Sequence, residues 1–215
     1  MQRFSDRHDA GRQLARKLSK YADQEDVILL ALPRGGVPVA CEIVQVIKAP
    51  MDLLIVRKLG LPGEEELAIG AIASGGIRIL NQDIIDILGI NQMTVDRVTE
   101  QEIVELQRRE QQYRGNRPAL DVHDCRVILV DDGLATGATM LAAIRAVRTR
   151  HPAQVVVAIP TASTQAIYLL RQEADEIHYV IAPEPFEGVG RWYEDFSQTT
   201  DEEVRSLLKK AGEKQ

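Results

Sequence analysis

The chain has 215 residues, of which 45% are hydrophobic and 27% are charged. This suits one compact α/β domain with room for an insertion, and we expect residues 1–215 to form a single domain. The formal net charge of −6 argues against a protein that binds nucleic acids or membrane surfaces in general. A polyanionic substrate would therefore need cationic side chains placed close to it.

The cysteines and histidines show no disulfide or metal-binding pattern. Cys41 and Cys125 form no C-x-x-C pair, and the four histidines lack the spacing of metal ligands. The sequence contains neither a signal peptide nor an apolar run of about 18 residues. We expect a cytoplasmic protein.

The first part of the chain predicts a helix and then a strand. Leu14, Ala15, Leu18 and Tyr21 recur at helical spacing, and Asp9 is the expected N-cap of that helix. The aliphatic run that follows, residues 27–32, predicts a strand that is buried on both faces.

The turn after this strand is a candidate anion site. Arg34 supplies a guanidinium fork, and Gly35 and Gly36 allow the backbone to approach a ligand closely, before a helix expected over residues 39–47. A simple turn is the alternative. A second loop of the same kind, farther along the chain, favours the anion site, because α/β sheets bind ligands at the C-terminal ends of their strands.

A third strand, expected over residues 53–56, leads into a segment with the marks of a mobile functional loop. Residues 57–66 begin with Arg57 and Lys58, become rich in glycine and proline, and end in three glutamates. A solvated charged loop without a function is the alternative. Residues 67–80 then carry the pattern of a β-hairpin.

Residues 81–118 predict a helical insertion. A short helix is expected over residues 83–88 and a long charged helix over residues 94–114, the latter with a thin apolar stripe formed by Val95, Val98, Ile103, Leu106 and Tyr113. A charged helix is usually a solvated surface element, so we assign it no chemistry.

The most informative stretch is residues 127–139, with the sequence Val-Ile-Leu-Val-Asp-Asp-Gly-Leu-Ala-Thr-Gly-Ala-Thr. Four aliphatic residues predict a buried strand, and the small residues before the next helix allow backbone N–H groups to surround an anion. Asp131 and Asp132 would repel the same phosphate, so they suit hydroxyl groups or a divalent cation. A ribose 5-phosphate meets both demands. An ordinary strand-to-helix turn with two solvated acids is the alternative.

Strands and helices continue to alternate beyond this stretch. Strands are expected over residues 154–159 and 177–181, and helices over residues 140–150 and 166–173. Such βαβ units predict a doubly wound, mostly parallel sheet flanked by helices. The remaining segment, residues 182–215, combines a Pro/Gly-rich loop with a closing helix. Its aromatic residues could stack on a flat base or pin the loop to the core; they include Phe186, Trp192 and Tyr193.

The stretch 127–139 resembles the phosphoribosyl pyrophosphate (PRPP) motif of type I phosphoribosyltransferases. The resemblance implies that Asp131 and Asp132 hold the ribose hydroxyls. It implies that the 5-phosphate is bound by the loop Ala135, Thr136, Gly137, Ala138 and Thr139. Gly133 departs from the pattern, since an aliphatic residue is usual there, and Ala135 makes the loop look more like the adenine branch than the 6-oxopurine branch.

Two further stretches resemble the same family. Residues 33–36 are similar to the pyrophosphate loop of xanthine-guanine enzymes, with Pro33 in place of serine, and imply that Arg34, Gly35 and Gly36 bind PRPP. Residues 57–66 resemble the flexible catalytic loop of the adenine branch without its second lysine. They imply that Arg57 and Lys58 bind PRPP and that an acid or base acts near the nitrogen, with Glu64 as first candidate beside Glu65 and Glu66.

The resemblance implies a core over about residues 9–181, a flexible β-hairpin loop, the helical insertion and a small C-terminal hood. It implies transfer of a 5-phosphoribosyl group from PRPP to a nitrogen of a heterocyclic base, with release of pyrophosphate. Arg34 and Lys58 would stabilise the leaving group. Mg²⁺ would be held mainly through PRPP, with Asp131 or Asp132 as candidate ligands.

The acceptor base stays open. In the family the hood recognises the base, which favours stacking by Phe186, Trp192 and Tyr193. A regulator that binds PRPP or a nucleotide without turnover is the alternative function, and a hydrolase of a phosphoribosyl bond is another. The fold implies oligomerisation, with a homodimer as the expected form, but no segment of the sequence identifies the interface.

Overall fold

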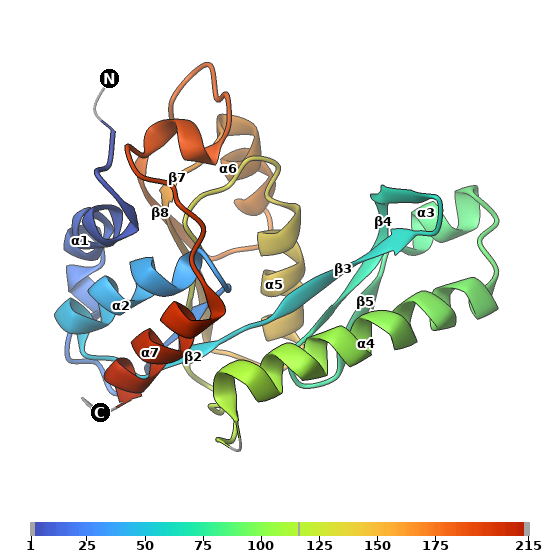
Figure 1. The fold of residues 1–215 in the computed structure, drawn as a ribbon, viewed down its shortest axis with the longest axis horizontal. Helices are drawn as coiled ribbons and strands as arrows, with labels where there is room; N and C mark the ends of the chain where they lie inside the picture. Colours follow the sequence, from blue (N-terminus) through green and yellow to red (C-terminus); the bar gives the residue numbers. More distant parts are fainter. Residues whose placement is uncertain (1–2, 116, 213–215) are drawn as a thin grey trace.

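A computed structural model describes residues 3–115 and 117–212. Its centre is a five-stranded parallel sheet in the order β2-β1-β6-β7-β8. The strands are Val27–Ala31 (β1), Met51–Leu53 (β2), Arg126–Val130 (β6), Gln154–Thr161 (β7) and Glu176–Ile181 (β8). β1 and β6 lie side by side, with Leu30 opposite Leu129, so the two predicted anion loops leave the same edge of the sheet next to each other. The doubly wound parallel sheet is confirmed (Figure 1).

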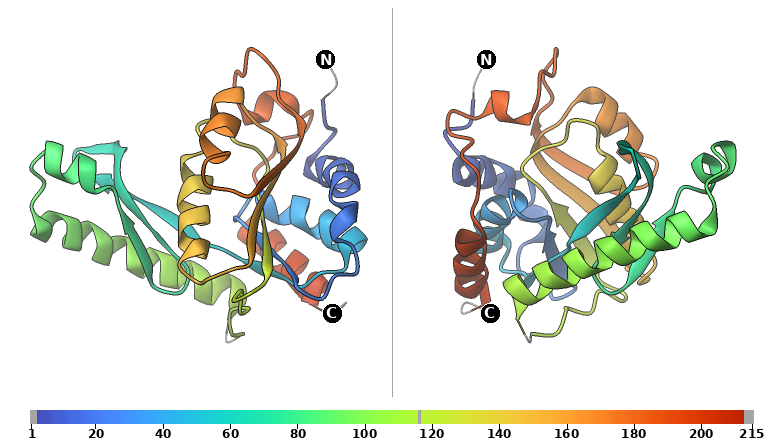
Figure 2. Two further views of the ribbon diagram at one scale, coloured as in Figure 1. Left: turned by 180° about the vertical axis from the view of Figure 1, so that it is seen from behind. Right: turned by 45° about the vertical axis from the view of Figure 1, so that its right-hand side comes forward.

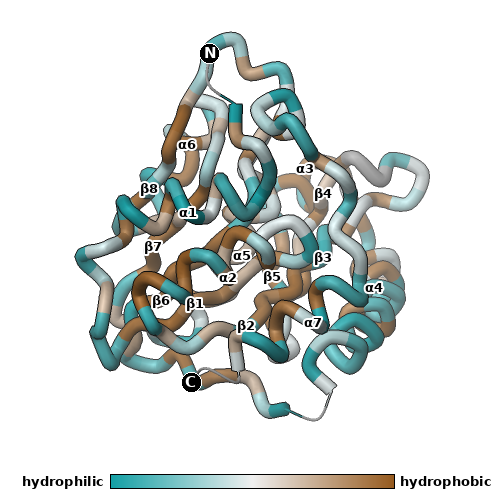
Figure 3. Tube along the Cα trace, turned by 60° about the vertical axis from the view of Figure 1, so that its left-hand side comes forward, coloured by the Kyte–Doolittle hydropathy of each residue, from teal (hydrophilic) through white to brown (hydrophobic). Residues whose placement is uncertain are grey.

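The sheet is covered on both faces because alternate aliphatic residues of each strand point in opposite directions. Ile128 and Val130 pack with the helices Arg7–Lys17 (α1), Gly36–Ile47 (α2) and Asp201–Gly212 (α7). Val127 and Leu129 pack on the opposite face, with Ala138–Arg148 (α5) and Thr164–Leu170 (α6). Figure 3 shows the resulting apolar interior along β1 and β6. Short 3₁₀ turns lie at Ser19–Tyr21 and Val189–Trp192.

An arm extends away from this core (Figures 1 and 2). It consists of the antiparallel strands Val56–Leu61 (β3), Glu64–Ala73 (β4) and Ile77–Leu80 (β5), with the helices Gln82–Ile87 (α3) and Gln92–Arg114 (α4). Residues 57–66, which were predicted as a mobile functional loop, lie mostly in strands β3 and β4. β3 and β4 form a hairpin that turns at Pro62 and Gly63, where Gly63 has a φ of 86°. The predicted hairpin over residues 67–80 is therefore part of a three-stranded antiparallel sheet that begins at Val56.

Several predicted boundaries also change. α1 begins at Arg7 because the side chain of Asp6, not that of Asp9, accepts the N-cap hydrogen bond, from the backbone N–H of Asp9. α2 begins at Gly36, directly after the first anion loop, rather than at residue 39. On α4 the predicted apolar stripe is buried except for Ile103, which is 37% exposed.

The N-terminal segment and the C-terminal hood run beside each other. Phe4 forms a parallel bridge with Tyr193, and Glu194 donates its backbone N–H to the carbonyl oxygen of Phe4 at 2.8 Å. The first described residues and hood residues 193–194 thus meet above the edge of the sheet that carries the loops. None of the helices in residues 3–115 and 117–212 is long and apolar enough to cross a membrane.

Candidate active site

The two anion loops approach each other so closely that both glycines of the first loop are required. A Cβ atom on Gly35 would lie 2.0 Å from Oδ2 of Asp132, and one on Gly36 would lie 2.5 Å from the carbonyl oxygen of Val130. Real Cβ atoms do not tolerate either distance. The first loop also contains a cis peptide bond between Pro33 and Arg34. The close approach joins the predicted pyrophosphate and ribose loops into one site.

Asp131 and Asp132 follow β6 and lie at the centre of this site. The backbone N–H of Asp132 donates to Oδ1 of Asp131 at 2.8 Å, which fixes the first carboxyl group. Burial raises the pKa of Asp131 well above its usual range, and the neighbouring charge of Asp132 raises it further. Burial also raises the pKa of Asp132, while Arg7 opposes that rise. Two buried acids in contact favour a ligand that satisfies them with hydroxyl donors or a cation.

Arg7 is a site residue that the sequence did not reveal. Its Nε donates to Oδ2 of Asp132 at 2.8 Å, and both side chains are largely buried, at 11% and 15% exposed. Arg7 lies in the polar segment before the first apolar helical stripe, 125 positions from its partner. Local spacing carries no signal for such a contact.

The second loop has the form of a phosphate cradle. Gly137 adopts a left-handed conformation with φ 77° and precedes α5, whose N-terminus carries partial positive charge. Ser163 donates its hydroxyl to the carbonyl oxygen of Ala135 at 2.6 Å and so pins the loop to the end of β7. The remaining cradle positions are exposed and accessible to a ligand: Ala135, Thr136, Ala138 and Thr139.

Gly133, the departure from the family pattern, has a structural cause. A Cβ atom there would lie 2.5 Å from Cγ1 of Val189 in the hood and 3.0 Å from Cγ2 of Thr161 in β7. Val189 therefore occupies the space in which an aliphatic side chain at position 133 would lie. The sequence showed the departure but not the distant residue that compensates for it.

The basic residues of the first half separate into two groups. Arg34 stays at the site, where its Nη1 lies 3.6 Å from Oδ1 of Asp201 at the start of α7. Arg57 points away and pairs with Glu102 of α4, with Nη2 and Oε2 2.6 Å apart. Because side chains alternate along β3, the next residue, Lys58, faces the opposite side.

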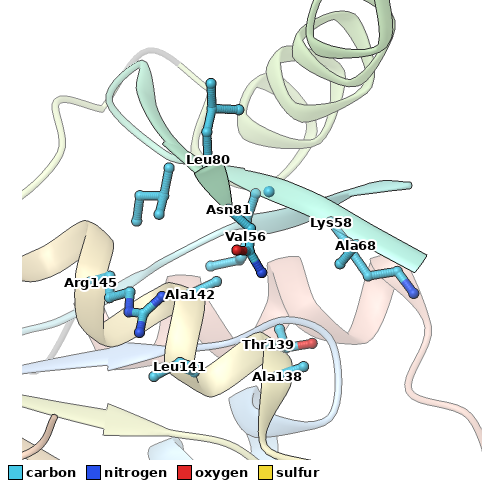
Figure 4. Close-up of a pocket in the computed structure, with 13 residues that line it drawn as sticks. Val56, Lys58, Ala68, Leu80, Asn81, Ala138, Thr139, Leu141, Ala142 and Arg145 are labelled. Carbon is cyan, nitrogen blue, oxygen red and sulfur yellow. The ribbon is translucent and has the colours of Figure 1, made fainter. Parts of the chain in front are cut away.

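Lys58 lines a cavity of about 190 Å³ between the arm and α5, together with Ala138 and Thr139 of the cradle. Figure 4 shows Lys58 at the same end of this cavity as Thr139. The structure thus brings Lys58, but not Arg57, to the second loop. Glu64 is exposed at the start of β4, and the side chains of Glu65 and Glu66 lie outside the described part.

The three hood aromatics have different surroundings. Phe186 is half-buried and lines a cleft of about 650 Å³ that it shares with Ala135 and Thr136 of the cradle. Tyr193 is 3% exposed and packs between Phe4 and Phe196, with ring centroids 5.3 and 5.0 Å away. Trp192 is 8% exposed, and its Nε1 has no partner within the described residues. Of these three, Phe186 lines the cleft that it shares with the cradle, whereas Trp192 and Tyr193 are buried, and their predicted stacking on a base stays a prediction.

Comparisons with known proteins identify the family of the chain. A model of the phosphoribosyl transferase domain matches residues 4–181. The chain is 41% identical over 211 residues to a protein of Mycobacterium tuberculosis strain H37Rv named "Putative phosphoribosyl transferase", which covers 98% of this chain and 47% of that protein. A protein of strain CDC 1551 with the same description matches equally. The chain spans about half the length of the curated relatives it matches.

Two solved structures share the fold. The crystal structure of TT1426 from Thermus thermophilus superimposes with a TM-score of 0.86 at 39% identity, over 96% of this chain and 97% of that chain. AQ2163 from Aquifex aeolicus gives a TM-score of 0.50 at 14% identity, over 81% and 73% of the two chains. The family model spans most of the chain, including both anion loops, so this chain belongs to the phosphoribosyl transferase family.

Proposed function

We propose that this chain transfers a 5-phosphoribosyl group from PRPP to a nitrogen of a heterocyclic base and releases pyrophosphate. The observation that carries the proposal is the contact of Gly35 with Asp132. It joins a cationic, glycine-rich loop to an acid pair and a phosphate cradle. One ligand with a diphosphate, two hydroxyls and a terminal phosphate would use all three parts.

In this reaction the cradle binds the 5-phosphate through backbone N–H groups and the hydroxyls of Thr136 and Thr139. Asp131 and Asp132 accept hydrogen bonds from the ribose hydroxyls and hold C1 in place for displacement. Arg34 and Lys58 stabilise the charge that develops on the leaving diphosphate. Each role matches a side chain at or beside the paired loops.

Mg²⁺ fits this donor set. Carboxylate oxygens are ligands that Mg²⁺ accepts, and it is usually held by one or two carboxylates together with substrate phosphates. No group of three or more acidic, histidine or cysteine side chains that could hold a metal occurs among the described residues, so most ligands would come from PRPP. The ion would neutralise charge on the diphosphate. Asp131 and Asp132 are the candidate protein ligands.

The cleft beside Phe186 is the proposed acceptor site. It adjoins Ala135 and Thr136, so a base stacked on this ring would lie near a ribose held by the cradle and the acid pair. Ser163, Gln165 and Glu184 supply polar groups to the lining. The hood thus offers an apolar platform with hydrogen-bonding partners.

The test is pyrophosphate release from Mg-PRPP in the presence of individual purine, pyrimidine and pyridine bases, with a control lacking any base. Release that depends on one base supports the transferase and identifies the acceptor. Release without base favours the hydrolase. Binding of Mg-PRPP by calorimetry without release from any base favours the regulator. Absence of binding overturns the proposal, and the Asp131→Asn/Asp132→Asn variant is the matched inactive control.

A further inference from the structure

Arg7 forms a buried junction between three parts of the molecule. Its Nε donates to Oδ2 of Asp132 at 2.8 Å, and its Nη1 donates to the carbonyl oxygen of Ser197 in the hood at 2.7 Å. The guanidinium also lies over the ring of Phe196, 4.0 Å from its centroid. One planar cation thus binds the ribose loop and the hood at the same time, a geometry that arginine allows and lysine does not reproduce.

The backbone fixes Arg7 in this position. The N–H of Phe4 donates to the carbonyl oxygen of Trp192 at 2.9 Å, and the N–H of Asp195 donates to that of Ser5 at 3.0 Å. Helix α1 starts at Arg7 itself, because the capping side chain of Asp6 precedes it. Hood residues 192–195 therefore hold the segment from which Arg7 reaches Asp132.

The hood contacts Asp132 by a second route. Tyr193 donates its hydroxyl to the main-chain carbonyl oxygen of Asp132 at 2.6 Å. The carboxylate of this residue is thus held through Arg7, and its backbone is held through Tyr193. Tyr193 belongs to the segment that follows the proposed acceptor cleft, and Arg7 is bound to that same segment through Ser197.

We infer that Arg7 is a positioning residue that couples the hood to the ribose-binding carboxylate of Asp132. This inference rests on the proposed function, since it assigns Asp132 to the ribose. A hood segment that shifts on ligand binding carries Ser197 and Phe196 with it, and Arg7 transmits the shift to Asp132. Loss of Arg7 leaves the carboxylate without its buried counter-ion and frees it from the hood.

The binding test compares Arg7→Met and Arg7→Lys with Arg16→Met, an exposed arginine of the same helix. The probes are Mg-PRPP, which needs Asp132, and inorganic phosphate, which needs only the cradle. We expect Arg7→Met to weaken Mg-PRPP binding about ten- to a hundredfold by calorimetry, because a charge-assisted hydrogen bond to a buried group is lost. Phosphate binding should change less than about twofold, and Arg7→Lys should recover part of the loss.

Equal weakening of both probes, or an unchanged affinity for Mg-PRPP, would overturn the inference. If Arg7→Met fails to fold, Phe196→Leu takes its place. It removes the ring under the guanidinium at a partly exposed position, and it should weaken Mg-PRPP binding alone.

Hydrogen exchange tests the coupling without a substrate. Arg7→Met should speed exchange of the backbone amides at residues 131–133 and 195–197, whereas Arg16→Met should leave them unchanged. Unchanged exchange in Arg7→Met would refute the link. Failure of the wild-type protein to bind Mg-PRPP would instead refute the proposed function, and the exchange result would still decide whether Arg7 joins hood and loop.

Discussion

Asp201 and Arg34 form an ion pair at the first anion loop, with Oδ1 and Nη1 3.6 Å apart. The same carboxylate accepts hydrogen bonds from the hydroxyl of Tyr113 at 2.6 Å and from Nε2 of Gln112 at 2.8 Å. Tyr113 and Gln112 hold the pKa of Asp201 below its usual value. A charged Asp201 therefore competes with any anion for Arg34.

We expect Asp201→Asn to bind Mg-pyrophosphate more tightly than the wild-type protein. The side chains of Asp201 and Arg34 are both about one third exposed. The affinity for Mg-pyrophosphate should therefore rise about two- to fivefold, as expected when a partly solvated ion pair is removed. Calorimetry measures it, with the neighbouring exposed residue in Glu202→Gln as the control. Weaker binding would mean that Asp201 orients Arg34 toward the ligand instead of competing with it.

The ionised side chain of Asp131 should make the ligand-free wild-type protein less stable at neutral pH than a variant with a neutral side chain at this position. Because the pKa of Asp131 is raised in the fold, the folded chain binds more protons than the unfolded chain as the pH rises above the ordinary carboxyl pKa. Stability therefore falls through that window. Thermal melts in a chelator should show Asp131→Asn to be more stable than wild type near pH 7, and the difference should disappear below about pH 4. An Asp131→Asn variant that melts lower at pH 7 would contradict this prediction.

Position 133 should tolerate a residue larger than glycine only when Val189 of the hood is replaced by a smaller residue. Gly133→Ala should lower the free energy of unfolding by about 1–3 kcal/mol, because its Cβ would meet Val189 at 2.5 Å. Val189→Ala in the same chain should restore part of that loss. Denaturant unfolding of the four proteins in the cycle measures the coupling. Additive effects would show that Thr161, not Val189, sets the restriction.

Phe186 and Trp192 should differ in their effects on the acceptor. Phe186→Ala removes the ring beside the cradle and should raise the KM for the acceptor base about three- to tenfold, with little change in the affinity for Mg-PRPP. Trp192→Phe keeps the buried packing and should leave both values nearly unchanged. Steady-state kinetics with the base identified by the pyrophosphate assay provides the comparison. A larger rise in the KM for the base in Trp192→Phe than in Phe186→Ala would show that the acceptor binds beside Trp192 instead.

Much of the site could be predicted because its main groups are local in sequence. Four aliphatic residues, two acids and a small-residue loop specify a strand, its end and a helix start, and parallel pairing of β1 with β6 then brings Gly35 to Asp132. The contacts that could not be predicted join distant segments. Arg7 and Asp201 lie in polar stretches without a motif, and only the folded chain places them on Asp132 and Arg34.

The arm was predicted incompletely for a different reason. Glycine, proline and charge in residues 57–66 resemble an irregular loop, yet strand pairing with β4 and packing against α4 override those local preferences. Stacking by Trp192 and Tyr193 stays a prediction: both side chains are buried, and sequence does not distinguish an aromatic that faces a ligand from one that fastens a loop to the core.

Helix α4 connects strand β3 of the arm to the residues beside Arg34. It carries Glu102, which pairs with Arg57 of β3, and Tyr113, which binds Asp201 beside Arg34. These two positions are eleven residues apart on one continuous helix, a rigid span of about 16 Å. We therefore expect α4 to act as a rigid connection, so that bending of the arm would displace Asp201 and reach the proposed leaving-group site without any ligand touching α4.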